Sequence, residues 1–150
     1  MNILEEINQK TFKTSYEKAV VNILFTYNWY RDLYKDVFAP HGIKPQHYNV
    51  LRILKGKSPD SCSPGEIKKV MLDKAPDLTR LLDKLEKMNF VNRQLCPENR
   101  RMMDIYITKK GESVLKDIQQ TQESLNMKRR RKISEEDAEK LSDLLDKFRD

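Results

Sequence analysis

Between residues 78 and 88 the apolar positions recur at spacings of three and four, which is the period of an α-helix. These positions are Leu78, Leu81, Leu82, Leu85 and Met88. Because residues at this spacing share one face, the pattern predicts an amphipathic helix over residues 76–88 that exposes Thr79 and Arg80. Pro76 suits the first helical position, and Asp77 would then lie in the first turn. Taken alone, the pattern is typical of a surface helix with a solvated charged face.

After residue 89 the apolar positions alternate with polar ones, as they do in strands that bury one face. The apolar positions are Val91, Leu95, Met103, Ile105 and Ile107. The turn formers of residues 97–99 separate two runs, so the sequence predicts a β-hairpin. Arg100 and Arg101 follow the turn directly, and residues 91–110 hold five basic side chains against two acidic ones. This charge can reach toward a polyanion, or it can protect an exposed strand edge from pairing with another chain.

A shorter helix is predicted ahead of the helix at 76–88. Ser63, Pro64 and Glu66 form an S-x-x-E capping box with proline at the first helical position. Ile67, Val70 and Met71 then recur at helical spacing. Only a brief turn fits before Pro76, so the two helices form a helix-turn-helix, and the hairpin makes it winged.

Long apolar stripes flank this winged region on both sides. The amino-terminal stripe lies on one long helix that ends before Pro40 and consists of Tyr16, Val20, Ile23, Tyr27, Tyr30, Tyr34 and Val37. Two further helices are predicted after the hairpin, one beginning near Thr108 and one opened by Ser134. Their apolar positions are Val114, Leu115, Ile118, Leu125, Ala138, Leu141, Leu144, Leu145 and Phe148. Two copies of the chain could bury these helices against each other, which indicates a homodimer.

The predicted fold class is mainly α with a small β-hairpin wing (α+β), a winged helix-turn-helix flanked by dimerisation helices. We expect a single domain over residues 1–150. Its dimerisation helices would occupy about 1–40 and 112–150, and its winged helix-turn-helix about 43–111.

The order of these segments resembles the multiple antibiotic resistance regulator (MarR) family of winged-helix transcription factors. The resembling stretches are GIKPQHYNVLRIL, CSPGEIKKVM, PDLTRLLDKLEKMNFVNRQ and PENRRMMDIYITKKG, and the resemblance covers essentially the whole chain. The most specific part is the wing signature, D-x-R followed by a strand that ends in L/I-T-x-K-G. Here it reads Asn99, Arg100, Arg101 and then residues 107–111, with Asn99 in place of the usual aspartate.

This resemblance implies a bacterial or archaeal homodimer that binds a pseudopalindromic operator in double-stranded DNA and releases it when a small ligand or oxidant arrives. The helix at 76–88 would enter the major groove. Arg101 occupies the position of the family's wing arginine, which enters the minor groove, and Asn99 lacks the carboxylate that would orient it. The candidate DNA-binding residues are Pro76, Asp77, Thr79, Arg80, Lys84, Asn99, Arg100 and Arg101.

Aromatic residues on the first long helix and its neighbour could line a pocket for a small-molecule effector. The candidate lining is Tyr27, Trp29, Tyr30, Tyr34, His47 and Tyr48. Aromatic residues at helical spacing are more typical of a core or an interface. The family resemblance favours the pocket but identifies no ligand.

Composition and charge favour a polyanionic partner, and the sequence argues against a secreted protein or a membrane protein. The chain has 150 residues, a net charge of +6 and a pI near 9.2. Its first ten residues carry acids where a secretory signal carries bases, and no apolar run is long enough to span a bilayer, so we expect a cytoplasmic protein without a membrane partner. The basic run at 127–132 is interpreted as a solvated helix end.

The two cysteines, Cys62 and Cys96, form no cluster with a histidine, so the sequence predicts no metal site. Basic neighbours of Cys96 make oxidation sensing a further hypothesis, although two reduced cysteines are ordinary in a cytosolic chain. No nucleophile motif or phosphate-binding glycine loop is present, so we expect neither an enzyme nor a cofactor.

The favoured function is a sequence-specific DNA-binding transcriptional regulator, a ligand-responsive repressor that acts as a homodimer. The alternative is a protein–protein interaction module whose Arg80, Arg100 and Arg101 pair with an acidic partner. RNA binding is a weaker alternative, because the predicted wing lacks the stacking aromatic residues of a single-strand platform.

Overall fold

The computed structural model describes residues 2–96, 102–129 and 132–150. The chain divides into two compact units, Met1–Gly42 and Ile43–Asp150. Within the described residues, none of the helices combines the length and the apolar character that crossing a membrane requires.

The first unit is built around one long helix. Helix α1 spans Ile3–Glu6, α2 spans Ser15–Phe38 and the 3₁₀ turn η1 spans Ala39–His41. The Thr14 side chain caps α2 by accepting from the Glu17 N–H at 3.0 Å. Because α2 ends just before Pro40, the predicted long amino-terminal helix is confirmed. Its apolar stripe is only partly buried, since Tyr16, Tyr27 and Tyr30 are all exposed.

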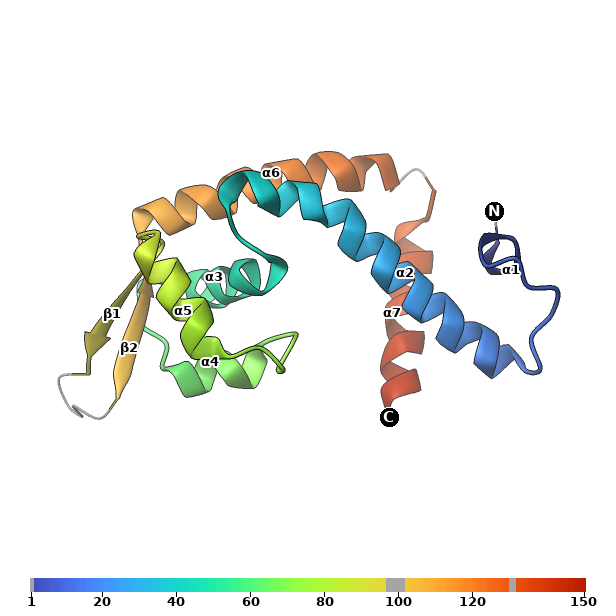
Figure 1. Ribbon diagram of the computed structural model, residues 1–150, viewed down its shortest axis with the longest axis horizontal. Helices are drawn as coiled ribbons and strands as arrows, with labels where there is room; N and C mark the ends of the chain where they lie inside the picture. The colour runs from blue at the N-terminus through green and yellow to red at the C-terminus, as the bar shows by residue number, and fades with distance from the viewer. Residues whose placement is uncertain (1, 97–101, 130–131) are drawn as a thin grey trace. The chain divides into compact units, whose positions relative to one another are not determined.

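The second unit is a winged helix followed by two further helices, and it confirms the predicted mainly α fold with a β-hairpin wing (Figure 1). Its helices are α3 (Pro45–Lys57), α4 (Pro64–Val70), α5 (Leu78–Lys87), α6 (Lys109–Arg129) and α7 (Glu135–Arg149). Its strands are β1 (Val91–Leu95) and β2 (Met103–Ile107). The capping box at Ser63 and the Ser134 cap of α7 both form as the sequence predicts.

In the core of the second unit, the apolar faces of α4, α5, α6 and the two strands pack around α3. Its most deeply buried aliphatic side chains are Val50, Leu51, Leu54, Ile67, Leu85, Val91, Ile105 and Ile118. They come from α3, α4, α5, both strands and α6. Burying these faces against one another fixes the position of α5, whose opposite face stays in solvent.

The strands pair antiparallel, with Val91 opposite Ile107 and Leu95 opposite Met103. Cys62 adds a third backbone segment, because its N–H and C=O both bond to Ile105 at 3.0 Å. Cys62 is therefore buried, and burial raises the pKa of its thiol. A thiol that resists ionisation is a poor target for oxidation, so Cys62 has a structural role.

Contacts at the base of the wing explain the I-T-x-K-G signature. The Thr108 hydroxyl donates to the Asn89 carbonyl at 2.7 Å and accepts from the Gly111 N–H at 3.0 Å. A Cβ added to Gly111 would lie 2.3 Å from the Phe90 carbonyl oxygen, so only glycine fits there. The turn from α5 into β1 is equally tight, since Asn89 has a left-handed backbone with φ of 60°. The wing is thus anchored to the end of α5.

Two apolar positions that the sequence assigns to buried faces are exposed, which corrects the prediction. Val70 is the last residue of α4, and Leu95 is the last residue of β1. Helical and strand periods identify a face, but the ends of elements reach beyond the neighbours that would cover that face.

Candidate nucleic-acid interface

Helix α5 begins two residues later than the sequence predicts. Its first residue is Leu78 and its N-cap is Asp77, whose carboxylate accepts from the Thr79 N–H at 3.0 Å. Pro76 therefore precedes the cap, and its placement at the first helical position is wrong. The physical reason is that an aspartate side chain satisfies a free N–H at the helix start, which proline cannot do.

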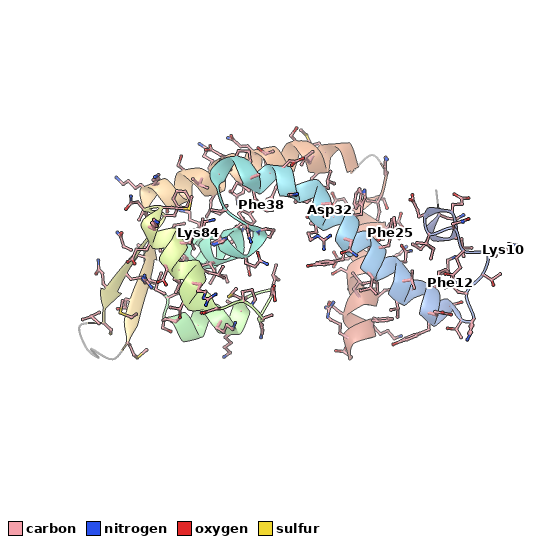
Figure 2. The ribbon with its side chains drawn as sticks, viewed as in Figure 1. Lys10, Phe12, Phe25, Asp32, Phe38 and Lys84 are labelled. Carbon is pink, nitrogen blue, oxygen red and sulfur yellow. The ribbon has the colours of Figure 1, made fainter. Side chains whose placement is uncertain are left out.

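The exposed face of α5 carries the polar residues that the sequence placed there. Thr79, Arg80 and Lys84 are exposed, whereas Leu78, Leu82 and Leu85 are buried. Figure 2 shows Lys84 on this helix. The Arg80 side chain is 88% exposed and lies 3.5 Å from Asp77 in an ion pair. So exposed a pair contributes little stability, and Arg80 can leave it for another anion.

Side chains from two other helices hold the turn between α4 and α5. The Asn49 side chain on α3 accepts from the Leu72 N–H at 2.9 Å. The Lys68 ammonium on α4 donates to the Pro76 carbonyl at 2.7 Å, and that of Lys74 donates to the Lys69 carbonyl at 3.0 Å. These contacts fix the entry into α5. Sequence reasoning missed them, because nothing in the sequence distinguishes a lysine that bonds a carbonyl from a solvated one.

Arg93 does not contribute free positive charge to the wing, contrary to the sequence prediction. It lies in β1, and its guanidinium contacts Asp83 at 2.7 Å and Glu86 at 2.9 Å, both on α5. The pair lowers the pKa of Glu86 and raises the pKa of Arg93. Arg93 is a structural link within the second unit.

The tip of the hairpin lies outside the described residues. This applies to Asn99, Arg100 and Arg101, three of the eight candidate DNA-binding residues. The strands leading to the tip are described up to Cys96, whose N–H donates to the Met102 carbonyl at 2.9 Å. The roles of the three tip residues, and oxidation sensing by Cys96, stay predictions.

The six candidate effector-pocket residues are divided between the two units. The first unit holds Tyr27, Trp29, Tyr30 and Tyr34, and the second holds His47 and Tyr48. Tyr34 and His47 are buried, and the Tyr48 hydroxyl donates to Gln122 of α6 at 2.8 Å. An effector pocket formed by these residues stays a prediction. A hollow of about 470 Å³ in the second unit contains none of them and is lined by Lys55, Lys109, Glu112, Ser113, Leu115, Lys116 and Gln119.

The pKa of His47 is lowered to about 4, mainly by burial and also by the nearby positive charges of Lys84 and Lys44. The neutral imidazole accepts from the Lys44 N–H at 3.1 Å through Nδ1. Above the unfolded-state pKa of about 6.5, both states are neutral and the native contacts are retained in full. Below it, only the unfolded chain gains the proton, so stability falls as the pH drops toward 4.

We expect this titration to cost about 3 kcal/mol of unfolding free energy between pH 7 and pH 4, because one pKa unit corresponds to about 1.4 kcal/mol. Urea unfolding at several pH values would measure the loss. The variant His47→Gln keeps an acceptor for the Lys44 N–H but cannot titrate, so its loss should be smaller by that amount. An identical pH dependence in both proteins would contradict the assignment.

The described residues contain no group of histidine, cysteine or acidic side chains that could hold a metal ion. The described residues do present the exposed polar face of α5 beside the β-hairpin. An α-helix fits the major groove of B-DNA, and a hairpin can contact the groove beside it.

The chain is similar to known proteins over its winged-helix region. Residues 43–103 match the model of the MarR family. Over 76 residues, the chain is 33% identical to the HTH-type transcriptional regulator PapX of Escherichia coli, a match that covers 51% of this chain and 46% of PapX. The chain thus matches about half the length of that curated relative.

Solved structures share the fold over nearly the whole chain. A MarR transcription factor from Planctomyces limnophilus is 26% identical with a TM-score of 0.69, and the match covers 91% of this chain and 98% of that one. A mutant MarR from E. coli complexed with operator DNA has a TM-score of 0.71 at 22% identity, with 99% of both chains covered. The resemblance found in the sequence is therefore confirmed, and the fold matches that of solved MarR structures.

Proposed function

We propose that the protein is a sequence-specific transcriptional regulator of the MarR family that binds double-stranded DNA. It acts in the cytoplasm as a homodimer, on an operator whose two half-sites are related by the dimer axis. It represses transcription and releases the operator when a small-molecule effector binds. Tyr27, Trp29, Tyr30, Tyr34, His47 and Tyr48 are the proposed effector-contacting residues.

The observation that carries this proposal is the exposed polar face of α5, whose first turn is held in place from two sides. Thr79 and Arg80 lie at the start of the helix, where the recognition helix of a helix-turn-helix contacts base edges. Their backbone is fixed by the Asp77 cap and by the Lys68 contact to the turn. A preorganised reading surface loses less conformational entropy on binding.

The remaining candidate residues take supporting roles in this mechanism. Lys84 and Arg100 contact phosphate, and Arg101 enters the minor groove, with Asn99 beside it. Asp77 would repel phosphate, so its closest favourable contact is a cytosine amino group. In the free protein Asp77 caps α5 and pairs with Arg80, and it thereby sets the starting position of that guanidinium. Pro76 lines the approach to the groove.

The alternative function is an interaction module for an acidic protein, because the same exposed Arg80 could pair with carboxylates. Carboxylate pairing would depend on charge but not on base sequence. A panel of duplexes therefore separates the two functions.

Single substitutions on the helix and the wing should have different effects. Arg80→Ala should cost about 1 to 3 kcal/mol at the best operator and relax preference at one position in each half-site, if the guanidinium reads a guanine edge. Arg101→Ala should weaken binding but leave the central preference unchanged, because the minor groove distinguishes mainly A·T from G·C pairs. Titration against single-base operator variants measures both effects.

Arg52→Ala is a matched control, because Arg52 is an exposed arginine of α3 outside the proposed surface. It should preserve the preference at every operator position. Circular dichroism confirms that each variant is folded. If both Arg80→Ala and Arg101→Ala bind the operator as the unsubstituted protein does, the DNA-binding surface is placed wrongly.

A further inference from the structure

Arg93 joins the two elements that would read DNA. It lies in the middle of β1, and its partners Asp83 and Glu86 lie about one turn apart on α5. Its Nη2 is 2.7 Å from Asp83 Oδ1, and its Nε is 2.9 Å from Glu86 Oε2. The Arg93 side chain is only 22% exposed, whereas both carboxylates reach it from the helix surface. Charge-assisted bonds from one guanidinium to two carboxylates restrict its direction more than a single ion pair would.

The base of the wing also contacts the end of α5 and the turn that follows it. There the Phe90 N–H donates to the Leu85 carbonyl at 2.9 Å, and the Thr108 hydroxyl donates to Asn89 at 2.7 Å. The middle of β2 is held as well, because the N–H and C=O of Cys62 both bond to Ile105 at 3.0 Å. Arg93 adds a direct link from the middle of β1 to the outer face of α5, which neither the base nor the Cys62 contact supplies.

The charge of α5 shows why the link has a cost for DNA binding. From Asp77 to Lys87 the chain carries three basic and three acidic residues, so the reading helix and its cap are electrically neutral. Replacing Asp83 and Glu86 by amides would remove two negative charges and strengthen attraction to phosphate. The carboxylates are therefore unfavourable for general DNA affinity, and their contribution must be sought in their contact with Arg93.

We propose that Arg93 is a positioning residue that fixes the angle between α5 and the wing, so that helix and wing engage one operator in register. This inference rests on the proposed DNA-binding function. Arg93 acts through Asp83 and Glu86 and does not itself contact DNA. Its effect falls on the discrimination between operator and random DNA rather than on overall affinity.

The double variant Asp83→Asn/Glu86→Gln distinguishes positioning from simple charge neutralisation. We expect its affinity for a random duplex to rise and its operator-to-random affinity ratio to fall about tenfold or more. If Arg93 merely neutralised the two acids, the affinities for both duplexes would rise together and the ratio would stay constant. That constant ratio would overturn the proposal.

Glu112→Gln/Asp117→Asn is the matched control. It makes the same change in net charge within the second unit, on α6, and neither residue pairs with Arg93 in the described structure. Its operator-to-random ratio should stay within about twofold of the unsubstituted value, because only non-specific attraction changes. Arg93→Lys should retain part of the ratio, since lysine keeps the charge but lacks the planar fork.

A second measurement needs no DNA. Spin labels on Cys96 and on Thr79→Cys report the distance between wing and helix, while the buried Cys62 stays unlabelled under native conditions. Dilution with unlabelled protein isolates distances within one chain. We expect a narrow distance distribution that broadens in Asp83→Asn/Glu86→Gln but not in the control. Equal widths in all three proteins would overturn the proposal.

Equal binding of the unsubstituted protein to every duplex would instead refute the proposed function, and the distance distributions would still decide the role of Arg93.

Discussion

Deleting residues 134–150 should convert the protein to a monomer and weaken its binding to a two-half-site operator by about a hundredfold or more. The deletion removes α7, which has no buried residue in the described structure yet presents an apolar stripe. Leu141, Leu144 and Phe148 are exposed on it, with Leu144 reaching 64%. An apolar face left in water is typical of a surface that another chain covers. Sedimentation equilibrium and operator titration would measure the two effects.

A separate half-site duplex controls for damage to the reading head. The truncated protein should bind one half-site as well as the intact chain does per subunit, because α3, α4, α5 and the hairpin are retained. Glu136→Gln serves as a control for changes in α7 itself, since it removes only the exposed ion pair to Lys140 at 2.7 Å. An intact chain that sediments as a DNA-competent monomer would refute the homodimer.

Gly111→Ala should destabilise the second unit by about 3 kcal/mol, because the new methyl group would require the wing base to move. Its Cβ would lie 2.3 Å from the Phe90 carbonyl oxygen and 3.0 Å from the Ile107 side chain. Backbone at Phe90 cannot yield easily, since its N–H and C=O are both used in bonds to Leu85 and Thr108. Urea unfolding followed by circular dichroism gives the change in unfolding free energy.

Gly56→Ala is the matched control for this substitution. Gly56 lies within α3, and a Cβ added there meets no atom within 4 Å. Alanine in a helix has less backbone freedom to lose than glycine, so this variant should gain about 0.5 to 1 kcal/mol. Opposite signs for the two variants are the expected result. A neutral Gly111→Ala would show that the contact at the wing base is not as close as the structure has it.

Local sequence signals predicted much of the fold. The Ser63 capping box opens α4, the spacing of Leu78, Leu82 and Leu85 places the buried face of α5, and Ser134 opens α7. Each of these features depends on residues within one or two turns of each other, so the chain's own spacing is sufficient. The error at Pro76 shows the limit of such signals, since proline and aspartate both favour helix starts and their order decides which of them caps.

Contacts between distant segments could not be predicted from spacing. The Cys62 bridge to Ile105 and the Asn49 bond to Leu72 join elements whose separation is set only when the core packs. Arg93 is the most instructive case. The sequence analysis counted it as part of a basic wing, yet the packed structure turns it toward two acids on α5. Charge counts along a strand do not reveal which charges are already paired.

The most direct test of the central proposal is the affinity of the intact protein for a duplex selected from random DNA, compared with a random duplex from about 50 to 200 mM salt. Lysine and arginine contacts to phosphate displace counterions, so both affinities should fall steeply as salt rises. The selected duplex should bind roughly a thousandfold more tightly than the random one at each concentration. Equal affinity for every duplex would contradict the account and favour an acidic protein partner for the same surface.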